Sequence, residues 1–230
     1  MDKSFNDVKA VLFDFGGTLD ADGLTWRQQF YPIYKKMGFD WTMKEFDPFF
    51  YFADDTLTER TLKTISFRKT IRMQVSLLLK KAGLYDRKIA GGVVTAYVKG
   101  SLASLKRNKP MLLRLKKKYK LGIISNFYGN LPVICREAGY HKIFDVIIDS
   151  GRAGVTKPDP GIFRLALKKL GLSPQEAAMV GDSLKRDMMG AKGLGMRHIR
   201  VLHNDAENRR TCCRGDRTIH SVRDLKGILL

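Results

Sequence analysis

The sequence predicts an α/β protein, with a parallel β-sheet covered by helices on both faces and an all-helical segment inserted after the first strand. Two observations predict the sheet. Short apolar runs rich in β-branched residues alternate with longer helical patterns, and the runs are apolar along most of their length, as in strands buried on both faces. A third observation predicts the insertion, because residues 22–106 contain no convincing strand.

Six segments have the composition of buried strands. They are residues 8–15, 121–126, 145–150, 178–183, 196–202 and 217–221. Helical patterns connect the later segments, with Pro near several helix starts and Gly at several helix ends. Sheets of this kind bind ligands at the carboxyl ends of their strands, so we expect the functional site there.

The inserted segment is expected to fold as a small cap over the strand ends. Its helical patterns cover about residues 24–37, 43–53, 58–82 and 86–105. We therefore divide the chain into a core of residues 1–21 and 107–230 and a cap of residues 22–106. Many aromatic residues lie between Trp26 and Phe52, and we expect most of them to form the cap's own core.

Composition restricts the class of protein. The 230 residues, 44% of them apolar, can bury a sizeable core, and no apolar stretch approaches the ~20 residues of a membrane span. The three cysteines, Cys135, Cys212 and Cys213, are an odd number without the spacing of a zinc site. Reduced thiols and a cytoplasmic protein without a membrane partner are expected. The sequence leaves the oligomeric state open.

Polar residues lie at the ends of four of the predicted strands. Asp14 ends the first strand, Ser125 and Asn126 end the second, Lys157 follows the third, and Asp182 and Asp187 follow the fourth. Each alone is typical of a helix cap or a surface charge. Four such signals, in order and each at a strand end, indicate one composite site.

The residue types in this set suit phosphoryl transfer. Asp14, Asp182 and Asp187 would hold Mg²⁺, a hard cation that prefers oxygen ligands, and the backbone carbonyl of Gly16 could be a further ligand. The metal would offset the repulsion between a phosphate group and the attacking carboxylate of Asp14. The sequence therefore predicts that the metal ligands and the nucleophile belong to the same site.

The remaining members of the set would bind the phosphate group. Ser125, Asn126 and the backbone N–H groups beside them are donors, and the Lys157 ammonium adds positive charge where negative charge develops. A phosphorylated small molecule is the expected substrate.

Four segments carry a family resemblance. "DFGGTL" (14–19), "IISN" (123–126), "KPDP" (157–160) and "GDSLKRD" (181–187) resemble, in order, the four motifs of the haloacid dehalogenase-like (HAD) hydrolase superfamily. The resemblance covers the core and implies a Rossmann-like α/β fold with a small helical cap between the first two motifs. Most members are Mg²⁺-dependent phosphatases that work through an aspartyl-phosphate.

The resemblance also implies roles for single residues. Asp14 matches the nucleophile, Ser125 the phosphate-binding hydroxyl and Lys157 the phosphate-side cation. Asp182 and Asp187 match the acids that bind the metal. These motifs are specific for the superfamily and carry no information about the substrate.

Gly16 departs from the pattern of the phosphatases. That position is an aspartate in them, and it protonates the leaving alcohol and then activates water. A lost general acid–base costs ~10²–10⁴ in rate. We therefore expect impaired or atypical acid–base catalysis, with Asp20, Asp22 or a cap residue as candidate substitutes.

Two branches of the superfamily also lack that aspartate. Haloacid dehalogenases need no metal and usually lose the acid that Asp182 retains here. Phosphonoacetaldehyde hydrolases form a Schiff base with a cap lysine. The cap lysines of this chain match no such context; they are Lys35, Lys36, Lys44 and Lys63.

Positive charge is concentrated in one segment. The chain carries a net +19, and between Arg60 and Arg136 nineteen Lys and Arg residues face one acid, Asp86. Such a segment is typical of a solvated surface or of a surface that attracts anions. The alternative function is therefore a catalytically weak binding protein that uses this segment for nucleic acid or an acidic partner.

Overall fold

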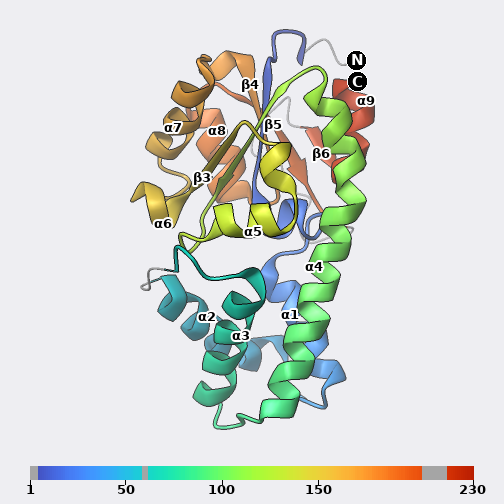
Figure 1. Ribbon diagram of the computed structural model, residues 1–230, viewed down its shortest axis with the longest axis vertical. Helices are drawn as coiled ribbons and strands as arrows, with labels where there is room; N and C mark the ends of the chain where they lie inside the picture. Colours follow the sequence, from blue (N-terminus) through green and yellow to red (C-terminus); the bar gives the residue numbers. More distant parts are fainter. Residues whose placement is uncertain (1–4, 59–61, 204–216) are drawn as a thin grey trace.

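The computed structural model describes residues 5–58, 62–203 and 217–230, and one parallel sheet of six strands lies at its centre (Figure 1). The strand order is β3-β2-β1-β4-β5-β6. The strands are β1 (Ala10–Phe13), β2 (Lys120–Ser125), β3 (Val146–Asp149), β4 (Ala177–Gly181), β5 (Arg197–Val201) and β6 (Arg217–Ile219). The prediction of a Rossmann-like α/β core is confirmed.

Helices cover both faces of the sheet (Figure 1). The core helices are α5 (Leu131–Glu137), α6 (Ser150–Ala153), α7 (Pro160–Leu170), α8 (Met189–Gly193) and α9 (Lys226–Leu229). Alternate residues of β1 point to opposite faces, since Val11 and Phe13 join one apolar cluster, and Ala10 and Leu12 the other. β1 is therefore buried on both sides, and the backbone of the next residue, Asp14, is held in a fixed position.

Four helices separate β1 from β2; the first three lie at one end of the sheet, and the fourth extends from there along the core (Figure 1). They are α1 (Trp26–Lys36), α2 (Met43–Thr58), α3 (Phe67–Lys81) and α4 (Arg87–Lys116). Aromatic side chains form much of the packing between them, and the rings of Phe30 and Tyr97 stack with centroids 3.9 Å apart. Part of this aromatic set also lines the cavity described below.

Two helix boundaries differ from the sequence-based expectation. The expected helix 58–82 begins only at Phe67, where the Ser66 side chain caps the helix by accepting from the N–H of Lys69. The expected end near residue 105 is absent, because α4 continues through Pro110 to Lys116. Pro110 is exposed, and the buried residues on either side of it, Leu105 and Met111 among them, outweigh one missing helical hydrogen bond.

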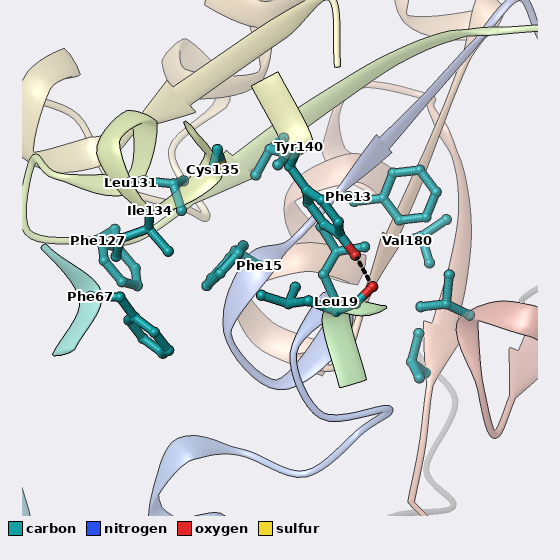
Figure 2. Packing of buried hydrophobic residues seen from close by; sticks show 14 of the residues in the cluster. Phe13, Phe15, Leu19, Phe67, Phe127, Leu131, Ile134, Cys135, Tyr140 and Val180 are labelled. Carbon is teal, nitrogen blue, oxygen red and sulfur yellow. Dashed lines mark hydrogen bonds between the residues drawn. The ribbon is translucent and has the colours of Figure 1, made fainter. Parts of the chain in front are cut away.

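The continuous α4 runs along both the inserted helices and the core (Figure 1). The proposed boundary between residues 106 and 107 thus falls inside one helix, and the division into core and cap stays a prediction. Tyr140 ties α4 to the core, since its hydroxyl donates to the carbonyl of Leu105 at 2.8 Å (Figure 2). Figure 2 also shows the Phe15 ring packed beside Phe127, with centroids 5.8 Å apart. This contact joins the segments that follow β1 and β2.

None of the described helices is both long and apolar enough to cross a membrane. Cys135 is a buried free thiol whose pKa burial raises to about 12, so it is protonated and unreactive at neutral pH. Cys212 and Cys213 lie outside the described residues.

Candidate active site

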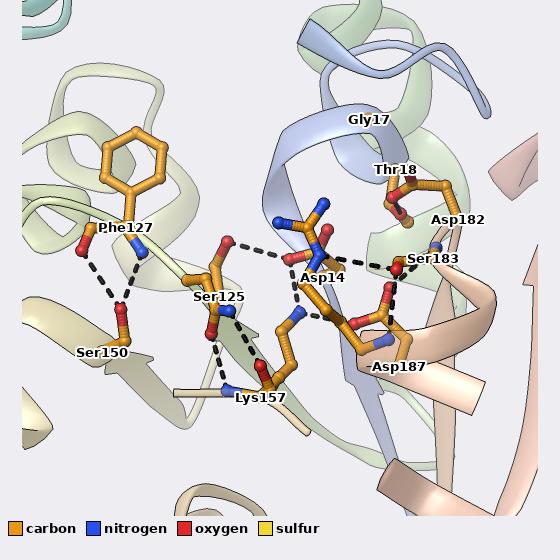
Figure 3. Close-up of polar contacts among 12 residues, drawn as sticks. Asp14, Gly17, Thr18, Ser125, Phe127, Ser150, Lys157, Asp182, Ser183 and Asp187 are labelled. Atoms are coloured by element: carbon orange, nitrogen blue, oxygen red, sulfur yellow. Dashed lines mark hydrogen bonds and ion pairs between the residues drawn. The ribbon is translucent and has the colours of Figure 1, made fainter. Parts of the chain in front are cut away.

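Asp14 lies at the centre of a polar cluster at the carboxyl edge of the sheet (Figure 3). Its N–H donates to the carbonyl of Val180 at 2.9 Å, so the backbone at Asp14 still belongs to the sheet. Two donors meet its Oδ1 atom: Ser125 Oγ at 2.8 Å and Lys157 Nζ at 2.7 Å. Asp14 and Ser125 lie at the ends of β1 and β2, whereas Lys157 lies in the loop between α6 and α7 rather than directly after β3.

Lys157 is almost fully buried and joins two carboxylates. Its Nζ lies 2.7 Å from Asp14 Oδ1 and 2.6 Å from Asp187 Oδ1. Burial disfavours the charged ammonium, but the attraction of the two carboxylates outweighs it and raises the pKa of Lys157. Lys157 is therefore a fixed positive charge beside the candidate nucleophile.

Asp14, Asp182 and Asp187 form a cluster in which one carboxylate oxygen of each lies within 4.8 Å of the others. Thr18 Oγ1 donates to Asp182 at 3.1 Å, and the N–H of Ser183 donates to Asp187 at 3.0 Å. Burial, and then the neighbouring negative charges, raise the pKa of Asp182 well above its ordinary value. A divalent cation would relieve this crowding of charge, so the donor set fits Mg²⁺.

The two glycines after Asp14 are glycines for different structural reasons. Gly17 has a φ of 89°, and a Cβ there would lie 2.8 Å from the Asp182 carboxylate. Gly16 has a φ of −75°, which any residue adopts. A Cβ on Gly16 would instead meet Trp26 Nε1 at 3.0 Å. Backbone strain thus does not explain Gly16, whereas the indole beside it does.

The expected substitutes Asp20 and Asp22 do not line the cavity above Asp14; both line a second cavity. Asp20 is buried and accepts from Trp26 Nε1 at 2.9 Å and from the N–H of Gly17 at 2.7 Å. Burial raises the pKa of Asp20 to about 7 in spite of these bonds. Asp22 accepts from the N–H of Val222 at 3.1 Å. Both carboxyl groups therefore stabilise the conformation of the loop that follows β1.

Asn126 also has a partner that the sequence does not reveal. Its side chain accepts from the N–H of Lys157 at 2.7 Å and donates to the carbonyl of Lys157 at 3.0 Å. The amide therefore positions the lysine loop, and phosphate binding by Asn126 stays a prediction that concerns its backbone N–H.

A cavity of about 340 Å³ opens above Asp14 and is lined by the core and by the inserted helices. Trp26 and Phe50 from the aromatic set of the inserted segment contribute to it, together with residues that sequence reasoning missed: Arg27, Asp54, Tyr128 and Arg186. Burial opposes the charge of Arg186, but nearby carboxylates, Asp14 foremost, raise its pKa, so it is a second cation at the site. A signal for Asp54 exists in the sequence, because it follows Phe46 and Phe50 at helical spacing on the apolar side of α2.

Fold and site together define an α/β protein with a carboxylate-centred site at the edge of a parallel sheet. A family model described as haloacid dehalogenase-like hydrolase matches residues 8–195, and the chain belongs to this hydrolase family. The resemblance stated from the four motifs is thereby confirmed.

Curated relatives include proteins named as phosphatases. A glyceraldehyde 3-phosphate phosphatase of Methanocaldococcus jannaschii is 32% identical over 155 residues, which are 64% of this chain and 67% of that protein. A phosphoserine phosphatase of Thermus thermophilus is 45% identical over 85 residues, 35% of this chain and 33% of that protein. The matches cover 33% to 56% of the length of the first three curated relatives.

Solved structures share the fold. An L-2-haloacid dehalogenase from Xanthobacter autotrophicus matches 96% of this chain and 98% of its own with a TM-score of 0.61 and 20% identity. A HAD phosphatase from Thermococcus onnurineus matches the same shares with a TM-score of 0.54 and 24% identity. At these identities the likeness concerns the fold alone.

Proposed function

We propose that the protein is a Mg²⁺-dependent phosphatase that acts on a phosphorylated small molecule through an aspartyl-phosphate on Asp14. The observation that carries the proposal is the convergence on Asp14 Oδ1 of Ser125 at 2.8 Å and Lys157 at 2.7 Å, beside the cluster with Asp182 and Asp187. Phosphatase-named relatives support it. The cysteine usage supports a cytoplasmic location.

Each residue of the site has a role in the proposed reaction that fits its position. Asp14 attacks phosphorus, and Ser125 and Lys157 bind phosphate oxygens with donors that are already in place. The carboxylates of Asp14, Asp182 and Asp187 and the carbonyl of Gly16 would hold Mg²⁺. When bound, the ion would offset the charge of the phosphate group.

Two other reactions of the family, phosphonate hydrolysis through a Schiff base and dehalogenation, are less well supported. Lys157 is the one lysine among the described residues that line the cavity, so no cap lysine is available there for a Schiff base. Lys35, Lys36, Lys44 and Lys63 are all exposed. Asp182, which dehalogenases usually lack, is present and buried.

A panel of phosphate esters and acyl phosphates, assayed with Mg²⁺ and with EDTA, tests the proposal. We expect release of inorganic phosphate only with the metal, and at least 10²-fold slower release by Asp14→Asn. Since Asn cannot form the aspartyl-phosphate, an Asp14→Asn protein as active as the parent would exclude the mechanism.

The basic segment supports a second candidate function, binding of nucleic acid or an acidic partner. Several of its cations lie exposed along α4: Arg87, Lys88, Lys99, Lys106 and Arg114. Binding by such a surface would weaken steeply with salt. A filter-binding titration at 50 mM and 200 mM salt distinguishes this function, because metal-dependent ester hydrolysis is not expected of it.

A further inference from the structure

No acidic side chain stands two residues after the nucleophile, where position 16 is a glycine. Gly16 has no side chain, and Trp26 Nε1 occupies the adjoining space while it donates to Asp20. An alkoxide leaving group is a poor one unless it is protonated as it departs. Resting on the phosphatase function above, we propose that the carboxyl of Asp54, on α2, protonates the leaving oxygen and later accepts a proton from water.

The first argument is position. Among the described residues, three carboxyl groups line the cavity above the nucleophile: those of Asp14, Asp182 and Asp54. Asp14 is the nucleophile in the proposed reaction, and Asp182 belongs to the metal cluster. Asp54 faces the cavity from the inserted helices, on the side where the part of the substrate beyond the phosphate would lie.

The second argument is the unsuitability of other donors that line the cavity. The Lys157 ammonium is held in ion pairs with Asp14 and Asp187, and a guanidinium such as that of Arg186 does not release its proton in proteins. Burial, followed by the charge of Asp54, raises the pKa of the Tyr128 hydroxyl well above its ordinary value. A carboxyl group loses and regains its proton far more readily than any of these.

The third argument is the surroundings of Asp54. The Tyr128 hydroxyl contacts Asp54 Oδ1 and also lies 3.4 Å from Gln74 Oε1. Because Tyr128 donates to Oδ1, a proton on this carboxyl lies on the other oxygen, Oδ2. Tyr128 therefore fixes the carboxyl and leaves Oδ2 as the atom that can donate a proton.

The charged groups that face Asp54 are few. Burial and the charge of Asp55 raise its pKa, and the Tyr128 hydrogen bond and Arg186 lower it, with a net rise. Asp54 Oδ2 has no hydrogen-bond partner among the residues that the structure describes, which leaves it for the leaving group. The carboxyl is thus poised to exchange a proton.

The two half-reactions balance. As an oxygen of Asp14 bonds to phosphorus, the ester P–O bond breaks and its oxygen takes the proton of Asp54, leaving an alcohol, the aspartyl-phosphate and an Asp54 carboxylate. Asp54 then takes a proton from water, whose oxygen bonds to phosphorus as the bond to Asp14 breaks. Inorganic phosphate leaves, and both carboxyl groups return to their starting states.

The test compares Asp54→Asn with Asp40→Asn, which alters an exposed acid that does not line the cavity. Glycerol phosphate has a leaving group that needs a proton, and p-nitrophenyl phosphate has one that does not. The constant kcat/KM reports the steps up to loss of the leaving group. We expect Asp54→Asn to lower kcat/KM at least 30-fold on glycerol phosphate and less than 3-fold on p-nitrophenyl phosphate, with Asp40→Asn near the parent on both.

An equal loss on both esters would show that Asp54 only binds substrate or supports the fold, and would overturn the proposal. So would an Asp54→Asn protein that matches Asp40→Asn on glycerol phosphate. A parent that hydrolyses no ester would instead refute the phosphatase function itself.

If Asp54→Asn does not fold, the pH dependence of kcat/KM for Tyr128→Phe tests the proposal instead. The parent's kcat/KM on glycerol phosphate should fall as pH rises through the pKa of Asp54, because the acid must be protonated. Loss of the Tyr128 hydrogen bond should move this fall to higher pH. An unmoved profile would overturn the proposal.

Discussion

The indole of Trp26 stands beside Gly16, so that the first atom of any side chain at position 16 would lie 3.0 Å from Trp26 Nε1. The same Nε1 donates to Asp20 at 2.9 Å. The three residues therefore depend on one another, because the absence of a side chain at Gly16 allows the Trp26 indole to hydrogen-bond with Asp20.

The first prediction concerns restoring an acid at Gly16. Gly16→Asp alone should lower the unfolding temperature, because its side chain collides with the indole. Adding Trp26→Ala removes the indole that causes the collision. The two changes should then be non-additive by about 0.5–3 kcal/mol in the free energy of unfolding, as for residues in contact. Urea titrations of both single variants and the double variant measure this coupling, and additive effects would contradict it.

The same double variant also tests acid–base catalysis. With the collision relieved, the new carboxyl lies two residues after the nucleophile and should raise kcat/KM on alkyl phosphates by ~10-fold or more over Trp26→Ala alone. Aryl phosphates should gain less. A folded double variant with no gain on any alkyl phosphate would favour the binding-protein alternative.

The second prediction concerns the metal. Mg²⁺ that binds the folded site should stabilise the protein by about 2.7 kcal/mol at a concentration 100 times its Kd, which corresponds to several degrees in unfolding temperature. Asp182→Asn should reduce this response, and Asp40→Asn, at an exposed acid, should retain it. Thermal melts across a Mg²⁺ titration are the measurement. Identical responses of the three proteins would refute the metal assignment.

The third prediction concerns the buried lysine. Lys157→Met should weaken binding of inorganic phosphate in the presence of Mg²⁺ by at least 10-fold, since it removes the ammonium 2.7 Å from Asp14. Lys168→Met, on the exposed side of α7, is the matched control. Calorimetric titration gives both affinities, and equal losses would mean that Lys157 contributes only general charge.

The fourth prediction concerns pH and Asp20. The folded pKa of about 7 lies above the ordinary value of 3.8, so between pH 4 and pH 7 the folded state keeps a proton that the unfolded chain has lost. This contribution to stability is complete below pH 4 and disappears as pH rises towards 7, by at most about 1.4 kcal/mol per pH unit. Asp20→Asn should show a flatter fall than the parent in urea titrations between pH 4 and pH 7. Asp55→Asn should keep the slope of the parent, and an unchanged slope in Asp20→Asn would contradict the burial argument.

Local sequence determined the sheet and the chain positions of the site. Apolar runs such as "AVLF" form strands because a sheet buried on both faces needs apolar side chains at every position. The residue after each such run must then lie at the carboxyl edge, which is why the sequence alone places Asp14, Ser125 and Asp182 together. Their order along the chain is also what carries the family resemblance.

Tertiary packing decided the features that depend on distant segments. The continuity of α4 through Pro110 follows from buried contacts on both sides of the proline, which helix propensity does not record. The approach of Trp26 to Gly16, and of Asp54 to Tyr128, brings together residues ten and 74 positions apart. No local pattern contains such distances, because they arise only when the inserted helices pack over the end of the sheet.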